Sequence, residues 1–271
     1  MPFSLTLVHS IDSTNTFLMN KAAEHVPLLD EKGTLTDGGK KFNLQVMAAE
    51  TQTKGRGRLG RTFESPDHSG IYFSFAFVPE GGISDPALIT VSACVGVCRA
   101  IEKTYGIKSR IKWVNDIYCN GKKVCGILTE GIVNPAAGRI DGCVCGIGIN
   151  IRTGDTFDSQ LKNKAGGILD GIDPSTKMAG RREFLQCCLD EIHEILIGGQ
   201  NIIQEYKDRS LLSGMTVTVT PVIGDDTTSY KGTVTEITDD FGLKVILEDG
   251  SEKTLHSGEV SLHDTDLGDL K

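Results

Sequence analysis

The sequence predicts an α+β fold that ends in a small all-β module. Residues 70–78 place four large apolar side chains on one face of an expected strand. Residues 178–197 instead repeat their apolar side chains at helical spacing. Beyond Gly214 only short alternating runs separated by turn residues remain, a pattern typical of a barrel-like module of about five strands. We therefore expect two domains, residues 1–213 and 214–271.

The first domain is expected to mix strands and helices. Its first helix should begin at residues 12–15, since Asp, Ser, Thr and Asn side chains accept hydrogen bonds from the free N–H groups of a first turn. Gly106 should end a buried helix, because glycine adopts the left-handed conformation there without strain. The expected strands are 5–8, 45–49, 70–78, 110–113, 117–119, 123–132 and 142–151, the further helices 88–105, 178–197 and 202–212, and the loops 26–43 and 153–176.

Two turn patterns fix strand connections. Asn120-Gly121 lies between two apolar runs and favours a tight two-residue hairpin. In the C-terminal module the expected strands are 215–222, 230–237, 243–247 and 253–262, with turns at 224–225, 240–242 and 249–250.

Charge and composition exclude several classes of protein. The net charge is −8, and residues 215–271 carry all of it with 4 Lys against 12 acidic residues. Such a chain is a poor partner for nucleic acid, whose binding depends on neutralising phosphates.

No run of 18 apolar residues occurs and the first residues lack a signal-peptide pattern, so we expect no membrane segment and a cytoplasmic protein. None of the 8 cysteines has C-x-x-C spacing, which favours reduced buried thiols over a catalytic thiol.

The stretch 54–61 (KGRGRLGR) carries four cations, three glycines and no acid. Glycines let backbone N–H groups close around an anion, and the forked arginine side chain matches carboxylate or phosphate. The glycines also satisfy G-x-G-x-x-G, but residues 62–67 cannot begin a helix well, which excludes a dinucleotide-binding fold. We predict a loop that orders over a phosphate-containing ligand; a mobile surface loop is the alternative.

Three further stretches can carry chemistry. Lys112 at a strand end can stabilise charge developing at phosphorus, and Asp116 can hold a divalent ion or orient the lysine. Lys122-Lys123 and Gly126 follow the hairpin turn, and residues 146–150 (GIGIN) form a strand with glycines that admit close backbone approach. The structural alternatives are an ordinary Asn-Asp turn, a solvated hairpin tip and a bulge.

In their order and spacing these motifs resemble those of the biotin protein ligases. The matching motifs are 13–15 (STN), 52–61 (QTKGRGRLGR), 112–116 (KWVND), 123–130 (KVCGILTE) and 148–150 (GIN), with a further match at 257–262 (SGEVSL). The resemblance implies a mixed β-sheet flanked by helices, of the class II aminoacyl-tRNA synthetase and biotin ligase type, with a C-terminal SH3-like β-barrel. It implies an ATP-dependent ligase that makes biotinyl-5′-AMP and then transfers biotin to a lysine of an acceptor domain.

The resemblance also implies the roles of individual residues. Lys112 and Arg56 are the implied catalytic residues. The implied biotin-binding residues are Ser13, Thr14, Asn15, Gln52, Gly55, Arg56, Arg58, Lys123 and Gly126. The implied ATP and adenylate residues are Arg58, Arg61, Lys112, Trp113, Asn115, Asp116 and Asn150. Mg²⁺ is expected with ATP, without identified protein ligands. The implied partners are biotin carboxyl carrier domains of carboxylases, and the chain is expected to be a monomer or weak homodimer.

The sequence departs from the family pattern at two places. Val114 stands where the family usually has proline, and the first motif begins at residue 12, so we expect no DNA-binding domain and no repressor role. The alternative activity is a lipoate or octanoate ligase or transferase of the same fold, and lipoyl transferases should lack the arginine-rich stretch. A non-catalytic nucleotide-binding module is the second alternative and would tolerate loss of Lys112.

Overall fold

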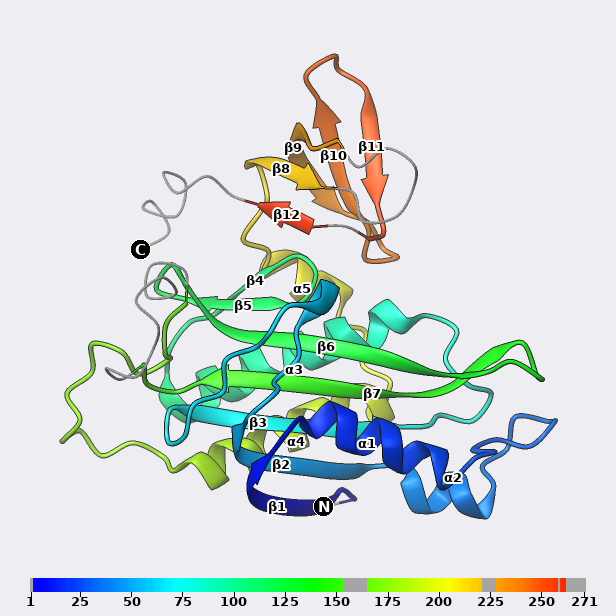
Figure 1. The fold of residues 1–271 in the computed structure, drawn as a ribbon. Coiled ribbons are helices and arrows are strands. Elements are labelled where there is room, and N and C mark those ends of the chain that lie inside the picture. Colours follow the sequence, from blue (N-terminus) through cyan, green and yellow to red (C-terminus); the bar gives the residue numbers. More distant parts are fainter. Residues whose placement is uncertain (1, 154–164, 221–227, 258, 262–271) are drawn as a thin grey trace.

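Two β-sheets organise the computed structural model, which describes residues 2–153, 165–220, 228–257 and 259–261 (Figure 1). The first sheet has seven strands in the order β1-β2-β3-β7-β6-β5-β4. Strands β1 and β2 are parallel and the other neighbours are antiparallel, so the sheet is mixed as expected. Its strands are β1 (Ser4–Ile11), β2 (Gln45–Gln52), β3 (Gly70–Phe77), β4 (Arg110–Lys112), β5 (Asp116–Cys119), β6 (Lys122–Asn134) and β7 (Arg139–Asn150).

Helices cover both faces of the first sheet. On one face α1 (Thr14–Ala23) and α2 (Asp37–Phe42) bury Leu18 and Phe42 against β2, β3 and β7. On the other face α3 (Pro86–Tyr105) and α4 (Arg181–Gly198) pack on Phe73 and Phe75 of β3. All eight residues of β3 are buried because side chains on both of its faces meet a helical layer.

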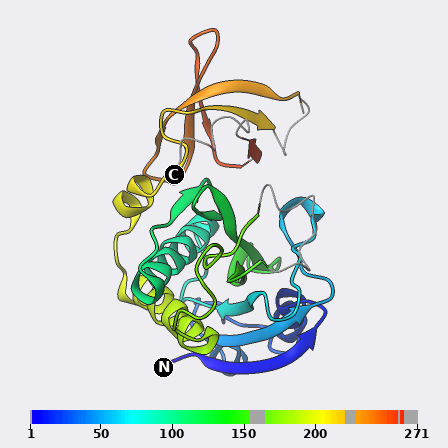
Figure 2. The same ribbon diagram turned by 90° about the vertical axis from the view of Figure 1, so that its left-hand side faces the viewer.

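The second sheet is antiparallel and has the order β11-β10-β9-β8-β12. Its strands are β8 (Thr216–Thr220), β9 (Tyr230–Ile237), β10 (Leu243–Leu247), β11 (Glu252–Leu255) and β12 (Glu259–Ser261). The short helix α5 (Ile203–Asp208) precedes it, and the sheet stands over the β4 and β5 edge of the first sheet (Figure 1, Figure 2). Among the described residues β11 and β12 are the two edges of an open sheet.

Most expected elements are confirmed, including the helix start, the helix end and the hairpin turn that individual residue types predicted. The Ser13 side chain accepts a hydrogen bond from the Thr16 N–H at the start of α1, and Gly106 ends α3 with φ +68°. Asn120 and Gly121 have φ +49° and +73°, the conformation that a tight hairpin turn requires. The eight cysteines are free, and all except Cys187 are buried. Within the described residues, none of the helices combines the length and apolar character needed to cross a membrane.

Three expectations are wrong in part. Residues 26–43 are not only a loop: they contain α2, whose Thr36 cap and buried Phe42 compensate for the two glycines of this six-residue helix. The helix expected at 202–212 ends at Asp208, because Ser210 pairs with Ile111 of β4. The run 253–262 forms two strands rather than one. The expected turn at 224–225 and most of the loop 153–176 lie outside the described residues.

Candidate active site

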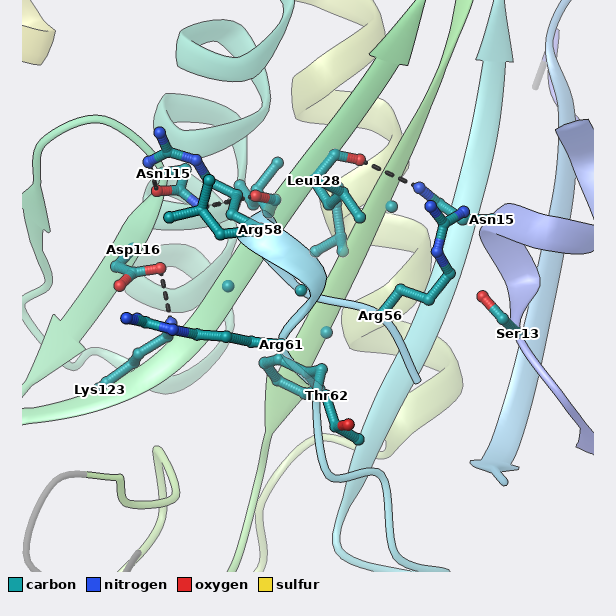
Figure 3. Close-up of a pocket in the computed structure, with 18 of the residues that line it drawn as sticks. Ser13, Asn15, Arg56, Arg58, Arg61, Thr62, Asn115, Asp116, Lys123 and Leu128 are labelled. Carbon is teal, nitrogen blue, oxygen red and sulfur yellow. Dashed lines mark hydrogen bonds and ion pairs between the residues drawn. The ribbon is translucent and has the colours of Figure 1, made fainter. Parts of the chain in front are cut away.

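One pocket gathers nearly all of the predicted site residues. It is a concave site that opens to solvent, the kind of site that holds a small-molecule ligand. It lies between the arginine-rich stretch, the first turn of α1, strands β4 to β7 and the end of the C-terminal sheet. The predicted residues that line it are Ser13, Thr14, Asn15, Gln52, Arg56, Arg58, Arg61, Lys112, Trp113, Asn115, Asp116, Lys123 and Gly126 (Figure 3).

Two predicted residues do not line the pocket. Gly55 is buried where the chain folds back on itself, and a Cβ there would lie 2.2 Å from the Phe63 carbonyl oxygen. Asn150 is 4% exposed at the end of β7, and its backbone carbonyl accepts a hydrogen bond from the Ile168 N–H. The Asn150 Oδ1 atom has no hydrogen-bond partner in the described part of the chain.

The arginine-rich stretch forms a compact loop, residues 54–61, whose guanidinium groups reach across the pocket. The Gly57 N–H donates to the Arg61 carbonyl at 2.7 Å and closes the loop. Arg56 makes two hydrogen bonds to Glu130, at 2.7 and 2.9 Å. Arg58 donates to Asn115 Oδ1 at 3.1 Å, as Figure 3 shows. These side chains tie the loop to β6 and to the turn between β4 and β5.

A chain of polar side chains runs along the α1 side of the pocket. The Thr14 N–H donates to Gln52 Oε1 at 2.8 Å, and Thr14 Oγ1 lies 2.7 Å from Ser74 Oγ. Ser74 donates to Asn15 Oδ1 at 2.5 Å, while Asn15 Nδ2 donates to Glu130 Oε2 at 2.9 Å. Each buried polar group therefore has a partner, and the chain presents oriented amide and hydroxyl groups to a ligand.

Lys112 stands at the end of β4, next to an ion pair. Lys123 Nζ lies 2.7 Å from Asp116 Oδ1 across the β5–β6 hairpin. Burial lowers the pKa of Lys112, Asp116 opposes this shift, and the positive charge of Lys123 adds to it. A lysine ammonium that has lost part of its hydration interacts more strongly with an anion that enters the pocket.

The pocket carries an excess of positive charge although the protein is acidic. Its cations are Arg56, Arg58, Arg61, Lys112 and Lys123, and the carboxylates beside them are Asp116, Glu130 and Glu259. Five cations against three carboxylates leave two positive charges for a ligand to balance. No described cysteine lines the pocket, and burial raises the pKa of Cys98 and Cys145 to about 12, which argues against a catalytic thiol.

Phe63 is a pocket residue that the sequence reasoning missed. Gly126 of β6 and Gly148 of β7 are register partners, and the Phe63 ring lies over both. A Cβ on Gly148 would lie 2.5 Å from Phe63 Cε1, and one on Gly126 would lie 3.1 Å from Cε2. The glycine pattern predicted a close approach at these strands, but the ring that makes it lies in a loop with no local signal.

The C-terminal sheet also reaches the pocket. Glu259 and Val260 of β12 line it, and Glu259 accepts two hydrogen bonds from Arg61, both at 2.6 Å. The Trp113 indole N–H donates to the Phe241 carbonyl at 2.8 Å, where both groups are buried. The acidic module is therefore part of the pocket wall. Glu259 lies in the matched motif 257–262, but its pairing with Arg61 across 198 positions was not predicted.

Most of the residues that line this pocket lie in a part of the chain that matches a known protein family. The family model described as "Biotin/lipoate A/B protein ligase family" matches residues 9–150. The bifunctional ligase/repressor BirA of Bacillus spizizenii is 34% identical over 147 residues, which are 54% of this chain and 45% of that protein. The Escherichia coli protein of the same name is 34% identical over 150 residues, 55% of this chain and 40% of that protein. The chain thus matches about half the length of these curated relatives.

A solved structure extends the similarity to most of the chain. The biotin protein ligase from Aquifex aeolicus in complex with biotin and ATP superposes with a TM-score of 0.73 at 26% identity. The match covers 96% of this chain and 98% of that one, so it includes both sheets.

Proposed function

The chain belongs to the biotin/lipoate A/B protein ligase family, and from this premise we propose that it is a biotin–protein ligase. The observation that carries the proposal is the convergence of the arginine loop, Lys112 and the polar chain around Asn15 on one pocket with excess positive charge. A carboxylate and a triphosphate must be brought together against their mutual repulsion, and the excess positive charge of the pocket offsets that repulsion. Biotin and ATP are present together in the similar Aquifex structure, which supports the same pair of ligands here.

In the proposed first step, a biotin carboxylate oxygen attacks the α-phosphorus of ATP and the bond to the pyrophosphate group breaks. The products are biotinyl-5′-AMP and pyrophosphate. Lys112 is the proposed stabiliser of the charge that develops on the phosphoryl oxygens, since its ammonium group sits on a rigid strand end. Arg56 and Arg58 neutralise the reactants, and alignment of the two can supply about 7–11 kcal/mol of the barrier.

In the proposed second step, the amine of an acceptor lysine attacks the activated carbonyl and AMP leaves. The acyl-adenylate is sensitive to water, so the arginine loop is useful as a cover between the two steps. We propose carrier domains of biotin-dependent carboxylases as the acceptors, since their biotinyl lysine is the product that this chemistry makes.

Roles follow from position in the pocket. We assign biotin to the side lined by Ser13, Thr14, Asn15, Gln52, Lys123 and Gly126, and the nucleotide to the side lined by Arg58, Arg61, Lys112, Trp113, Asn115 and Asp116. Gly55 supports the loop, and Asn150 supports the end of β7. Mg²⁺ fits this donor set: nucleotide-bound magnesium is typically held by one or two carboxylates together with phosphates, and the Asp116 carboxylate lines the pocket. When bound, the ion would neutralise phosphate charge.

The same premise supports proposals on domains, location and oligomeric state. We propose domains at 1–213 and 214–271, because the C-terminal strands form a separate five-stranded sheet, and we propose that this sheet is an SH3-like barrel. We propose a cytoplasmic location, which the eight free cysteines support. We also propose that the chain acts as a monomer or weak homodimer without DNA.

The test is ATP–pyrophosphate exchange by the purified chain with biotin, lipoate or octanoate as the only added acid. We expect exchange that depends on biotin, and mass spectrometry of the chain after incubation with ATP and biotin should detect bound biotinyl-5′-AMP. Exchange that lipoate or octanoate supports and biotin does not would overturn the proposal in favour of the other branch of the family. Absence of exchange with all three acids would favour a non-catalytic module.

A further inference from the structure

A second cluster of reactive side chains lies outside the pocket, at the β1 edge of the first sheet. His9 of β1 and Glu50 of β2 face each other across the parallel pair, since Val8 pairs with Ala49 and Ser10 with Thr51. Asp67 and His68 reach the same place from the turn before β3. Two imidazoles and two carboxylates from three separate segments therefore meet on one surface, and none of them lines the pocket.

The distances within this cluster suit a small ion. His9 Nδ1 lies 3.1 Å from Glu50 Oε2, and His9 Nε2 lies 3.8 Å from Asp67 Oδ2. His68 Nε2 lies 3.3 Å from the same Asp67 oxygen. One ligand atom from each of His9, Glu50 and Asp67 can be chosen so that all lie within 4.8 Å of one another. A tetrahedral ion with bonds of about 2.1 Å needs ligand atoms about 3.4 Å apart. His68 lies outside the group of three, so its side chain must rotate toward His9 and Glu50 to supply the fourth ligand.

The donor set selects the class of ion. Neutral imidazole nitrogens suit zinc and neighbouring transition metals, whereas Mg²⁺ and Ca²⁺ prefer oxygen ligands alone. Two carboxylates supply the two negative charges that balance a divalent cation. We propose that His9, Glu50, Asp67 and His68 form a binding site for one divalent transition-metal ion of the zinc class. This site is independent of the proposed ligase activity.

One neighbour opposes the site. An Arg181 guanidinium nitrogen lies 3.4 Å from His68 Nδ1, so its positive charge stands close to the metal position. Arg181 is the first residue of α4 and contributes no ligand, so it must turn away when the ion binds. Removing this charge should therefore tighten metal binding.

The site would connect the pocket loop to the sheet edge. Asp67 and His68 follow the segment that returns from the arginine loop, and the Ser65 carbonyl in that segment accepts a hydrogen bond from Thr51 Oγ1 of β2 at 2.8 Å. A bound ion would add a further attachment of this segment to β1 and β2, which ties the exit of the loop to the edge of the sheet.

The experiment is calorimetric titration of the untagged full chain with ZnCl₂, in a Cys187→Ser background because this thiol is the least buried of the eight. We expect one ion per chain, and weakening of binding by at least about tenfold in His9→Gln and in His68→Gln. Arg181→Gln should bind more tightly than the parent. His256→Gln is the matched control, since His256 is a surface histidine 3.8 Å from a single aspartate and should leave binding unchanged.

CoCl₂ gives a second readout that does not depend on heat. Bound Co²⁺ should show visible ligand-field absorption with the parent chain, and the double variant His9→Gln/His68→Gln should abolish it. MgCl₂ should neither bind there nor displace Co²⁺. Equal zinc affinity in the parent and the double variant, or no stoichiometric binding by the parent, would overturn the proposal. These measurements need no biotin or ATP, so failure of the ligase proposal would leave them readable.

Discussion

Gly146 of β7 leaves the space that Asn15 occupies. A Cβ built on Gly146 would lie 2.0 Å from Asn15 Oδ1 and 2.7 Å from its Cγ, far inside van der Waals contact. Asn15 is 4% exposed, and its side chain cannot move aside without giving up its hydrogen-bond partners. We predict that Gly146→Ala displaces the Asn15 amide and breaks the polar chain along the α1 side of the pocket.

The size of the effect follows from the bonds that Asn15 makes. It accepts from Ser74, donates to the Leu128 carbonyl at 3.2 Å, and donates to the charged Glu130. Two neutral hydrogen bonds contribute about 1 kcal/mol each and a charged one about 2 kcal/mol, so full loss costs about 4 kcal/mol. Partial rearrangement would keep some bonds, and we expect the free energy of unfolding to fall by about 2–4 kcal/mol.

The assay is urea unfolding followed by circular dichroism and by the fluorescence of Trp113, the one tryptophan of the chain. Gly131→Ala in β6 is the control, since a Cβ there meets only the tip of Ile140 at 3.3 Å. The decisive comparison is made in an Asn15→Ala background, where the obstacle is gone and Gly146→Ala should cost little. An equal loss of stability in both backgrounds would refute the steric reasoning. Calorimetry should also show weaker biotin binding for Gly146→Ala alone.

Three other predictions concern the cations of the pocket. Burial lowers the pKa of Lys112, and only the protonated side chain can stabilise phosphate charge, so the rate of ATP–pyrophosphate exchange should decline as the pH rises through a pKa below that of an ordinary lysine. Lys112→Arg should move this decline to higher pH, and Lys112→Ala should slow exchange at least about 100-fold. Arg58→Gly removes the link to Asn115 and should release biotinyl-5′-AMP, seen as labelling of bystander lysines; labelling equal to the parent chain would contradict this role. Glu259→Gln frees Arg61 from an exposed ion pair that contributes up to about 1 kcal/mol. Titration with ATP should therefore show an ATP affinity raised by up to about fivefold. An unchanged ATP affinity would show that the ion pair does not compete with the nucleotide.

Sequence reasoning predicted the parts of this protein that depend on local chemistry. The Asn120-Gly121 turn, the Ser13 cap and the Gly106 helix end were predictable because each depends on residues within one turn of the chain. The paired glycines Gly126 and Gly148 indicated a close approach in the same way. Family resemblance then grouped motifs that lie far apart in the chain, and the structure brings most of them to one pocket.

The features that escaped prediction depend on contacts between distant segments. Helix α2 is only six residues long and contains two glycines, so no periodicity marks it, and burial of Phe42 supplies what propensity does not. Arg61 pairs with Glu259, and the Trp113 indole donates to the Phe241 carbonyl. Both contacts join the first sheet and its loops to the C-terminal module. A backbone carbonyl has no side-chain signature, so its role as a partner can be seen only in three dimensions.

The hydrogen bond from Trp113 to the Phe241 carbonyl means that the two walls of the pocket form at different times during synthesis. The strands of the first sheet and its helices have all left the ribosome well before residue 241, and domains generally fold as units from the N-terminal end. Until the last strands follow, the buried indole N–H lacks its acceptor and the pocket lacks one wall. A nascent chain would therefore hold a folded first sheet beside a pocket that still lacks the wall formed by Glu259 and Val260.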